Sequence, residues 1–173
     1  MKFDTIIIGG GLSGLISGIY LSQRGQRCVI ISSGQSALHF SSGSFDLLNN
    51  LPDGTSVQKP LDAISKLIQQ APSHPYAKLG ENKFKILTQQ TKEFLKNAGI
   101  ATQGDYEKNH YRVTPMGTLK STWLTLENLL ISENEKCLPI RHPGIFNVTG
   151  FLDFYTQFIT DEFLKLGTKC SIH

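Results

Sequence analysis

The chain has 173 residues, of which 39% are hydrophobic and 18% charged, a balance that is typical of a globular protein and excludes a disordered one. The formal net charge of +3 is too small to favour a nucleic-acid partner, and no basic stripe interleaved with aromatic residues occurs. The three cysteines, Cys28, Cys137 and Cys170, are far apart and form no C-x-x-C motif, so no metal site is predicted and a reducing cytoplasm is favoured.

The N-terminal residues predict a strand, a helix and a second strand. The β-branched run Ile6–Ile8 is typical of a short buried strand, and a helix is expected over residues 12–24. Gly25 is suited to end that helix, and residues 27–31 predict the second strand. This order is that of a βαβ unit at the start of a doubly wound sheet.

Three glycines between the first strand and the helix have the spacing G-x-G-x-x-G. Gly9 would allow a tight turn, Gly11 would let a pyrophosphate approach the backbone, and Gly14 would let the helix pack closely on the strand. The free N–H groups at the start of the helix would bind the phosphate. The predicted cofactor contacts in this turn are Gly9, Gly10, Gly11, Leu12, Ser13 and Gly14.

Two other interpretations of this stretch stay open. The glycines could form a structural turn that binds no ligand. Residues 5–23 carry no charge and contain G-x-x-x-G twice, at Gly10, Gly14 and Gly18, as in some membrane helices. Three adjacent glycines and several serines make a poor membrane-spanning segment, so nucleotide binding is favoured.

A hydroxyl-rich segment follows the second strand, over residues 32–44. Such a segment can donate many hydrogen bonds to a phosphate or a flavin, although a solvated loop is the simpler alternative. The predicted contacts here are Ser32, Ser33, Ser41, Ser42, Gly43 and Ser44.

The acidic residue that usually holds an adenosine ribose is missing. No Asp or Glu occurs between Asp4 and Asp46, and Ser32 stands at the end of the second strand, where that acid is expected. No Arg or Lys follows Arg27 until Lys59, so no cation is placed for a 2′-phosphate. The sequence therefore argues against both NAD and NADP as the cofactor.

The remaining elements are predicted from periodicity and turn residues. Helices are expected over residues 60–70 and 81–98, a hairpin between 111–114 and 118–124, and a strand over 145–148, whereas 125–138 is ambiguous. Residues 50–130 are interpreted as an inserted helical and hairpin segment. Residues 168–173 look like a new, unpaired strand, so the chain is expected to be the N-terminal part of a longer protein.

A last helix is predicted from Gly150 to about residue 166, with one strongly apolar face. This face is expected to be internal, although a membrane or partner surface has the same spacing. Its predicted members are Phe151, Phe154, Tyr155, Phe158, Ile159, Phe163 and Leu166.

The glycine turn, with Gly18, Leu21 and Gly25, resembles the first βαβ unit of two-dinucleotide-binding-domain flavoproteins. Three further stretches are similar to the B subunit of the bacterial anaerobic glycerol-3-phosphate dehydrogenases: residues 34–48, 71–76 and 112–124. The resemblance extends over residues 1–124 and returns weakly at 150–154.

This resemblance implies an α/β fold with a Rossmann-type (FAD/NAD(P)-binding-like) three-layer flavoprotein core, here truncated at the C-terminus. It implies oxidation of sn-glycerol 3-phosphate to dihydroxyacetone phosphate, with electrons passed to the quinone pool and then to fumarate or nitrate. The implied cofactor is FMN, with FAD as the alternative, and FMN suits Ser32 because it has no adenosine. The implied partners are a catalytic A subunit and an iron–sulfur C subunit. The implied location is peripheral, on the cytoplasmic side of the inner membrane, without a transmembrane segment.

Two other functions remain as alternatives: an NAD-linked dehydrogenase and a non-catalytic membrane-anchoring scaffold. No catalytic base is identified, since the histidines are candidates by residue type only: His39, His74, His110, His142 and His173.

Arg112 and Lys120 lie close together on the predicted hairpin and are candidates for holding a substrate phosphate.

Overall fold

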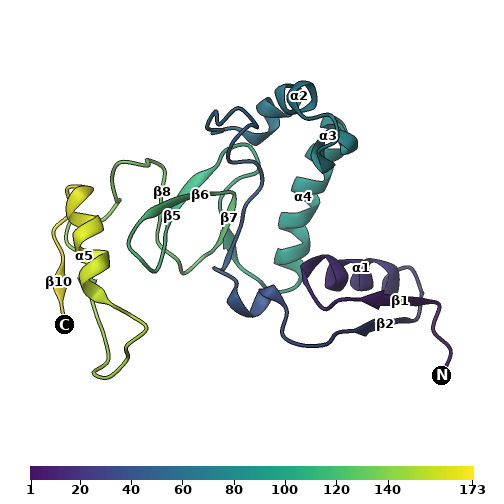
Figure 1. The fold of residues 1–173 in the computed structure, drawn as a ribbon, viewed down its shortest axis with the longest axis horizontal. Coiled ribbons are helices and arrows are strands. Elements are labelled where there is room, and N and C mark those ends of the chain that lie inside the picture. Colours follow the sequence, from purple (N-terminus) through teal and green to yellow (C-terminus); the bar gives the residue numbers. More distant parts are fainter. The chain divides into compact units, whose positions relative to one another are not determined.

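The computed structural model describes all residues from 1 to 173, and they form two compact units, residues 1–42 and residues 43–173. Unit 1 contains β1 (Thr5–Ile8), α1 (Leu12–Ser22), β2 (Cys28–Ile31) and the 3₁₀ helix η1 (Ala37–Phe40). β1 and β2 pair in parallel, from Thr5 opposite Cys28 to Ile8 opposite Ile31. α1 lies along one face of this pair (Figure 1). The predicted βαβ unit is confirmed.

The prediction that the first strand is buried is wrong within this chain. The side chains of Ile6 and Ile8 are 63% and 89% exposed, whereas Ile7 is half-buried. Successive side chains of a strand point to opposite faces, and α1 covers only one face of the two-stranded sheet. The exposed isoleucines therefore belong to the face that α1 does not cover.

Unit 2 contains two antiparallel three-stranded sheets. One has the order β3 (Ser44–Phe45), β7 (Leu124–Leu126), β4 (Thr102–Gln103), and the other has the order β6 (Leu119–Thr122), β5 (His110–Val113), β8 (Ile131–Ser132). The predicted hairpin is confirmed as β5 and β6, joined through Gly117 at φ +83°. Its second strand ends earlier than predicted, because the N–H of Trp123 bonds to the carbonyl of Phe45 and the chain continues in the other sheet.

The helices of unit 2 are α2 (Pro60–Gln70), α3 (Pro75–Leu79), α4 (Glu81–Asn97) and α5 (Thr156–Lys165). α2 and α4 confirm the predicted helices, and Gly99 at φ +75° follows α4. The buried positions of α4 are Phe84, Thr88 and Leu95, while Leu87 is 40% exposed. The short helix α3 was not predicted.

α5 begins at Thr156, later than the start predicted directly after Gly150. Gly150 has φ +87°, and the side-chain amide of Asn147 donates to the carbonyl of Phe154 at 2.9 Å, so the intervening residues form a loop. Of the predicted apolar face, Ile159 and Phe163 are buried. Phe158 is 50% exposed, which corrects the prediction that it is internal.

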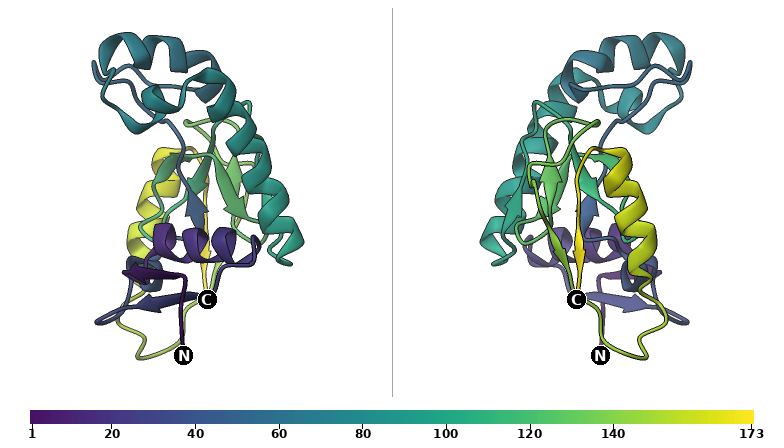
Figure 2. Two further views of the ribbon diagram at one scale, coloured as in Figure 1. Left: turned by 90° about the vertical axis from the view of Figure 1, so that its right-hand side faces the viewer. Right: turned by 90° about the vertical axis from the view of Figure 1, so that its left-hand side faces the viewer.

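The last strand is paired. β10 (Ser171–Ile172) runs parallel to β9 (Gly144–Ile145), which is shorter than the strand predicted over residues 145–148. α5 lies beside this pair (Figures 1 and 2). The side chains of Ile159 and Phe163 pack with that of Ile145. None of the helices combines the length and the apolar character needed to cross a membrane.

Candidate functional site

The glycine turn joins the carboxyl end of β1 to the first residue of α1. Gly9 has φ +108°, a conformation that favours glycine, and its N–H donates to the carbonyl of Ile31 at 2.8 Å. This bond fixes the turn at the ends of both parallel strands. In open α/β sheets, ligands bind outside these carboxyl ends.

Gly14 is held too close to the turn to carry a side chain. A Cβ at this position would collide with the carbonyl oxygen of Gly9 and would lie 3.3 Å from Cγ2 of Ile7. Gly18, one turn later, is buried, and a Cβ there would lie 3.2 Å from Cδ1 of Ile30. The close helix–strand packing expected of the third glycine is therefore present in the structure.

The start of α1 is suited to an anion. A Cβ at Gly11, the N-cap, would meet no protein atom within 4 Å, so the space beside the backbone is open there. No side chain caps this end and its first turn contains no acidic residue. The N–H groups of Leu12, Ser13 and Gly14 and the positive end of the helix dipole therefore have no competing negative side chain.

Ser32 lies next to the turn. A Cβ at Gly10 would be 3.2 Å from the hydroxyl oxygen of Ser32, which donates to the carbonyl of Gly34 at 3.2 Å. Ser33 follows it and is exposed. The structure thus brings Ser32, from the end of β2, together with the glycine turn, from the end of β1.

The rest of the hydroxyl-rich segment is divided between the units. Ser41 and Ser42 follow η1 at the end of unit 1, whereas Gly43 and Ser44 belong to unit 2. A Cβ at Gly43 would lie 3.1 Å from the side chain of Leu126, and Ser44 begins β3. The predicted loop is therefore in part a strand of a sheet.

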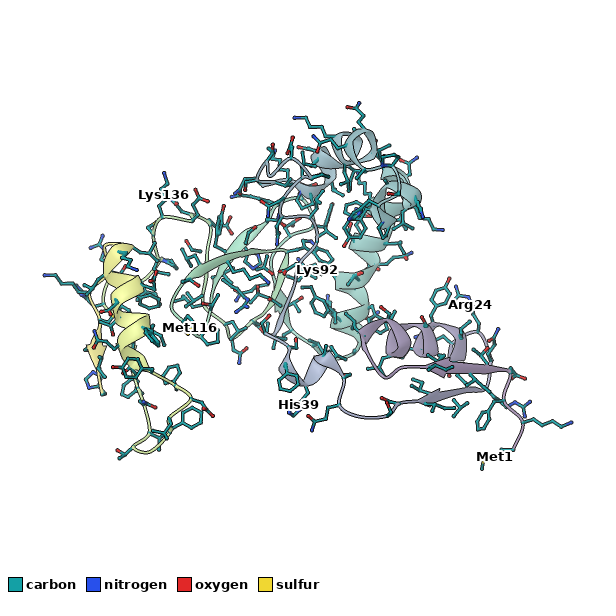
Figure 3. All side chains as sticks on the ribbon, in the orientation of Figure 1. Met1, Arg24, His39, Lys92, Met116 and Lys136 are labelled. Carbon is teal, nitrogen blue, oxygen red and sulfur yellow. The ribbon has the colours of Figure 1, made fainter.

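The histidines share no common site. His39 lies on η1 (Figure 3) and is exposed. Its ring is edge-on to that of Phe40. His74 accepts a hydrogen bond from the N–H of Tyr76 at the start of α3. His142 and His173 are exposed. None is placed as a catalytic base by these contacts.

His110 is different, because it is 2% exposed and belongs to a buried polar layer in unit 2. Its Nε2 lies 2.7 Å from the hydroxyl of Thr125 on β7, and burial lowers the pKa of the imidazole. On the same strand, Nε of Arg112 donates to the hydroxyl of Ser44 on β3 at 2.9 Å. We call His110, Arg112, Ser44 and Thr125 the polar layer.

Only part of this arrangement could be predicted. Residues 110 and 112 are two apart on β5 and share a face, but the predicted hairpin began at residue 111 and contained only Arg112 of the two. Their contacts with Ser44 and Thr125 depend on strands that lie elsewhere in the sequence.

Comparison with known proteins gives the family. A family model described as an FAD binding domain matches residues 4–171. The chain is 44% identical over 170 residues to a protein of Yersinia enterocolitica and 46% identical over 168 residues to one of Yersinia pestis. It is 45% identical over 163 residues to a protein of Haemophilus ducreyi. Each of these relatives is named as the B subunit of an anaerobic glycerol-3-phosphate dehydrogenase.

The alignments cover 98%, 96% and 94% of this chain and 40%, 40% and 38% of the respective relatives, so the chain spans about 40% of their length. No solved structure matches the chain. The family match extends through nearly all of the chain and includes the glycine turn at the end of β1. The chain therefore belongs to the FAD-binding domain family, with a Rossmann-type flavoprotein fold and a flavin as its cofactor.

Proposed function

We propose that the chain is part of the flavin-carrying B subunit of an anaerobic glycerol-3-phosphate dehydrogenase. The glycine turn is the observation that carries the proposal, because its open backbone at Gly11 and its uncapped helix end suit the phosphate of a flavin. The names of the relatives support the choice of dehydrogenase.

The proposed reaction is the oxidation of sn-glycerol 3-phosphate to dihydroxyacetone phosphate. A bound flavin would accept two electrons and pass them on one at a time. The residues of unit 1 bind and orient the cofactor: the first N–H groups of α1 hold the phosphate, and Ser32 lies beside them. We propose that the electrons pass to the quinone pool, with fumarate or nitrate as the final acceptor.

The proposed assembly includes a catalytic A subunit and an iron–sulfur C subunit. The subunit designation in the relatives' names supports a complex of several chains. We place this complex peripherally on the cytoplasmic side of the inner membrane.

Within the flavins, we expect FMN to be preferred over FAD, which is the cofactor in the family's description. Ser32 offers a ribose a neutral hydroxyl in place of a carboxylate, a difference of about 1–3 kcal/mol, or roughly ten- to hundredfold in affinity. Extraction of the native cofactor from the complete protein, followed by chromatography against both standards, should give FMN. Stoichiometric FAD would contradict this expectation, because the protein would then hold the adenosine ribose without an acidic residue at position 32.

Anaerobic titration of the assembled, flavin-loaded enzyme tests the proposed function. Addition of sn-glycerol 3-phosphate should bleach the flavin absorbance, and a soluble quinone should restore it. Glycerol, which lacks the phosphate, is the matched control and should leave the spectrum unchanged. A flavin that stays oxidised with glycerol 3-phosphate would contradict the proposal, and a folded but colourless protein would favour the scaffold function.

A further inference from the structure

We propose that Arg112 is the centre of a phosphate-binding site formed by residues of unit 2 and assigned by its buried, unneutralised charge. The inference rests on the proposed function for the identity of the ligand, a phosphate monoester. The site itself follows from the contacts and burial of the polar layer.

Arg112 is a buried cation without a carboxylate partner. It is 5% exposed, and the ion pairs of the structure join other residues. Its hydrogen bonds go to neutral acceptors, from Nε to the hydroxyl of Ser44 at 2.9 Å and from Nη1 to the carbonyl of Val113 at 3.2 Å. Burying a charge is costly unless an opposite charge accompanies it, so this arrangement favours an anion as the missing partner.

The neighbouring strand supplies no negative charge that neutralises Arg112. Arg112 on β5 is directly opposite Lys120 on β6, and like charges at such positions destabilise a sheet. Nζ of Lys120 lies 2.6 Å from a carboxylate oxygen of Asp46, so that carboxylate is already paired with the lysine. Taken together, Arg112, Lys120 and Asp46 keep an excess of one positive charge.

The chemistry of the guanidinium selects the ligand class. Arginine has five N–H donors in a planar fork that matches phosphate oxygens, and two of these donors are engaged by Ser44 and Val113. The hydrogen bond to Ser44 fixes the orientation of the fork, and the net positive charge that remains after Lys120 pairs with Asp46 suits a phosphate.

The ligand of this site is the free phosphate monoester, since the phosphate of the flavin is assigned to the glycine turn. An Arg112→Gln variant of the complete protein should therefore retain its flavin and lose phosphate binding. Loss of flavin together with phosphate binding from a folded variant would contradict this assignment.

The test is calorimetric titration of the complete protein with inorganic phosphate at constant ionic strength. Wild type should bind phosphate, and Arg112→Gln should bind it roughly ten- to hundredfold more weakly, because a charge-assisted hydrogen bond is lost. Arg112→Lys keeps the charge but not the fork, and should be intermediate. Arg141→Gln is the matched control, since Arg141 is exposed and should be replaceable without effect.

If Arg112→Gln does not fold, Arg112→Lys and Ser44→Ala carry the test, and both should weaken phosphate binding. Equal phosphate affinity in wild type and these variants would overturn the site, as would a wild type that does not bind phosphate. Bleaching of the flavin by glycerol 3-phosphate in wild type is a separate result, so the proposed function can stand when the site fails. Conversely, if the variants lose phosphate binding but glycerol 3-phosphate does not bleach the flavin of wild type, the site stands and the proposed function fails.

Discussion

Gly14 shows how a single missing side chain shapes the candidate site. Alanine at this position would push its Cβ into the carbonyl oxygen of Gly9, so the turn or the helix would have to move. We expect Gly14→Ala to lower the free energy of unfolding by about 1–3 kcal/mol, as overpacking does elsewhere. Chemical denaturation of the complete protein measures this loss.

The matched control is Gly34→Ala, because a Cβ at Gly34 meets no atom within 4 Å. This variant should unfold close to the wild-type midpoint. Equal destabilisation by both substitutions would mean that the close packing of Gly14 contributes nothing specific.

His110 predicts a dependence of stability on pH. Burial lowers the pKa of its imidazole below the ordinary 6.5, although the charge of Glu133 acts in the opposite direction. The fold therefore favours neutral histidine, and its contribution to stability is present above pH 6.5 and is lost as the pH falls from there towards the folded-state pKa.

Melting temperatures of the complete protein above and below that pH test this prediction. His110→Gln should reduce the loss of melting temperature on acidification, whereas His39→Gln, at an exposed position, should retain the wild-type loss. An unchanged pH dependence in His110→Gln would contradict the assignment to His110.

At the scale of elements, α5 separates buried from exposed aromatic side chains. Phe163 is buried with Ile145 and Ile159, whereas Phe158 is half-exposed. Phe163→Ala should therefore cost about 3–5 kcal/mol of unfolding free energy, and Phe158→Ala about 1 kcal/mol or less. Denaturant titration of the two variants compares these losses, and similar values would show that the aromatic face is not divided in this way.

The elements that could be predicted well from the sequence have strong local signals. Such signals are Pro60 at the start of α2, Gly99 directly after α4 and Gly117 in the hairpin turn. The start of α5 was misplaced because Phe151 to Tyr155 continue the helical spacing of apolar residues. The positive φ of Gly150 and the hydrogen bond from the side chain of Asn147 to the carbonyl of Phe154 hold these residues in a loop. Neither feature can be inferred from the spacing of apolar residues.

In the candidate site as well, local contacts could be predicted and contacts between distant residues could not. The turn from Gly9 to Gly14 could be predicted because each glycine acts on backbone within a few residues, and Ser32 follows from the parallel pairing of two short strands. The contact of Arg112 with Ser44 joins residues 68 positions apart. It could not be predicted because it depends on how two separate sheets pack.

At the scale of the whole molecule, the two units differ in their cores. Unit 2 buries large apolar side chains, including Ile64, Leu67, Phe84 and Leu124. The buried position of unit 1 is Gly18. A ligand that binds only the folded state raises stability by mass action, so flavin bound at the glycine turn should raise the stability of unit 1.

The proposed function depends above all on a flavin held at the glycine turn, and the flavin content of Gly11→Val is the decisive measurement. Valine at Gly11 would meet no protein atom within 4 Å of its Cβ, so the complete protein should fold with a far-ultraviolet dichroism spectrum near that of wild type. Its side chain would occupy the space through which the phosphate approaches. We expect a folded variant that has lost its flavin, and a folded variant that retains stoichiometric flavin would contradict the assignment of the turn.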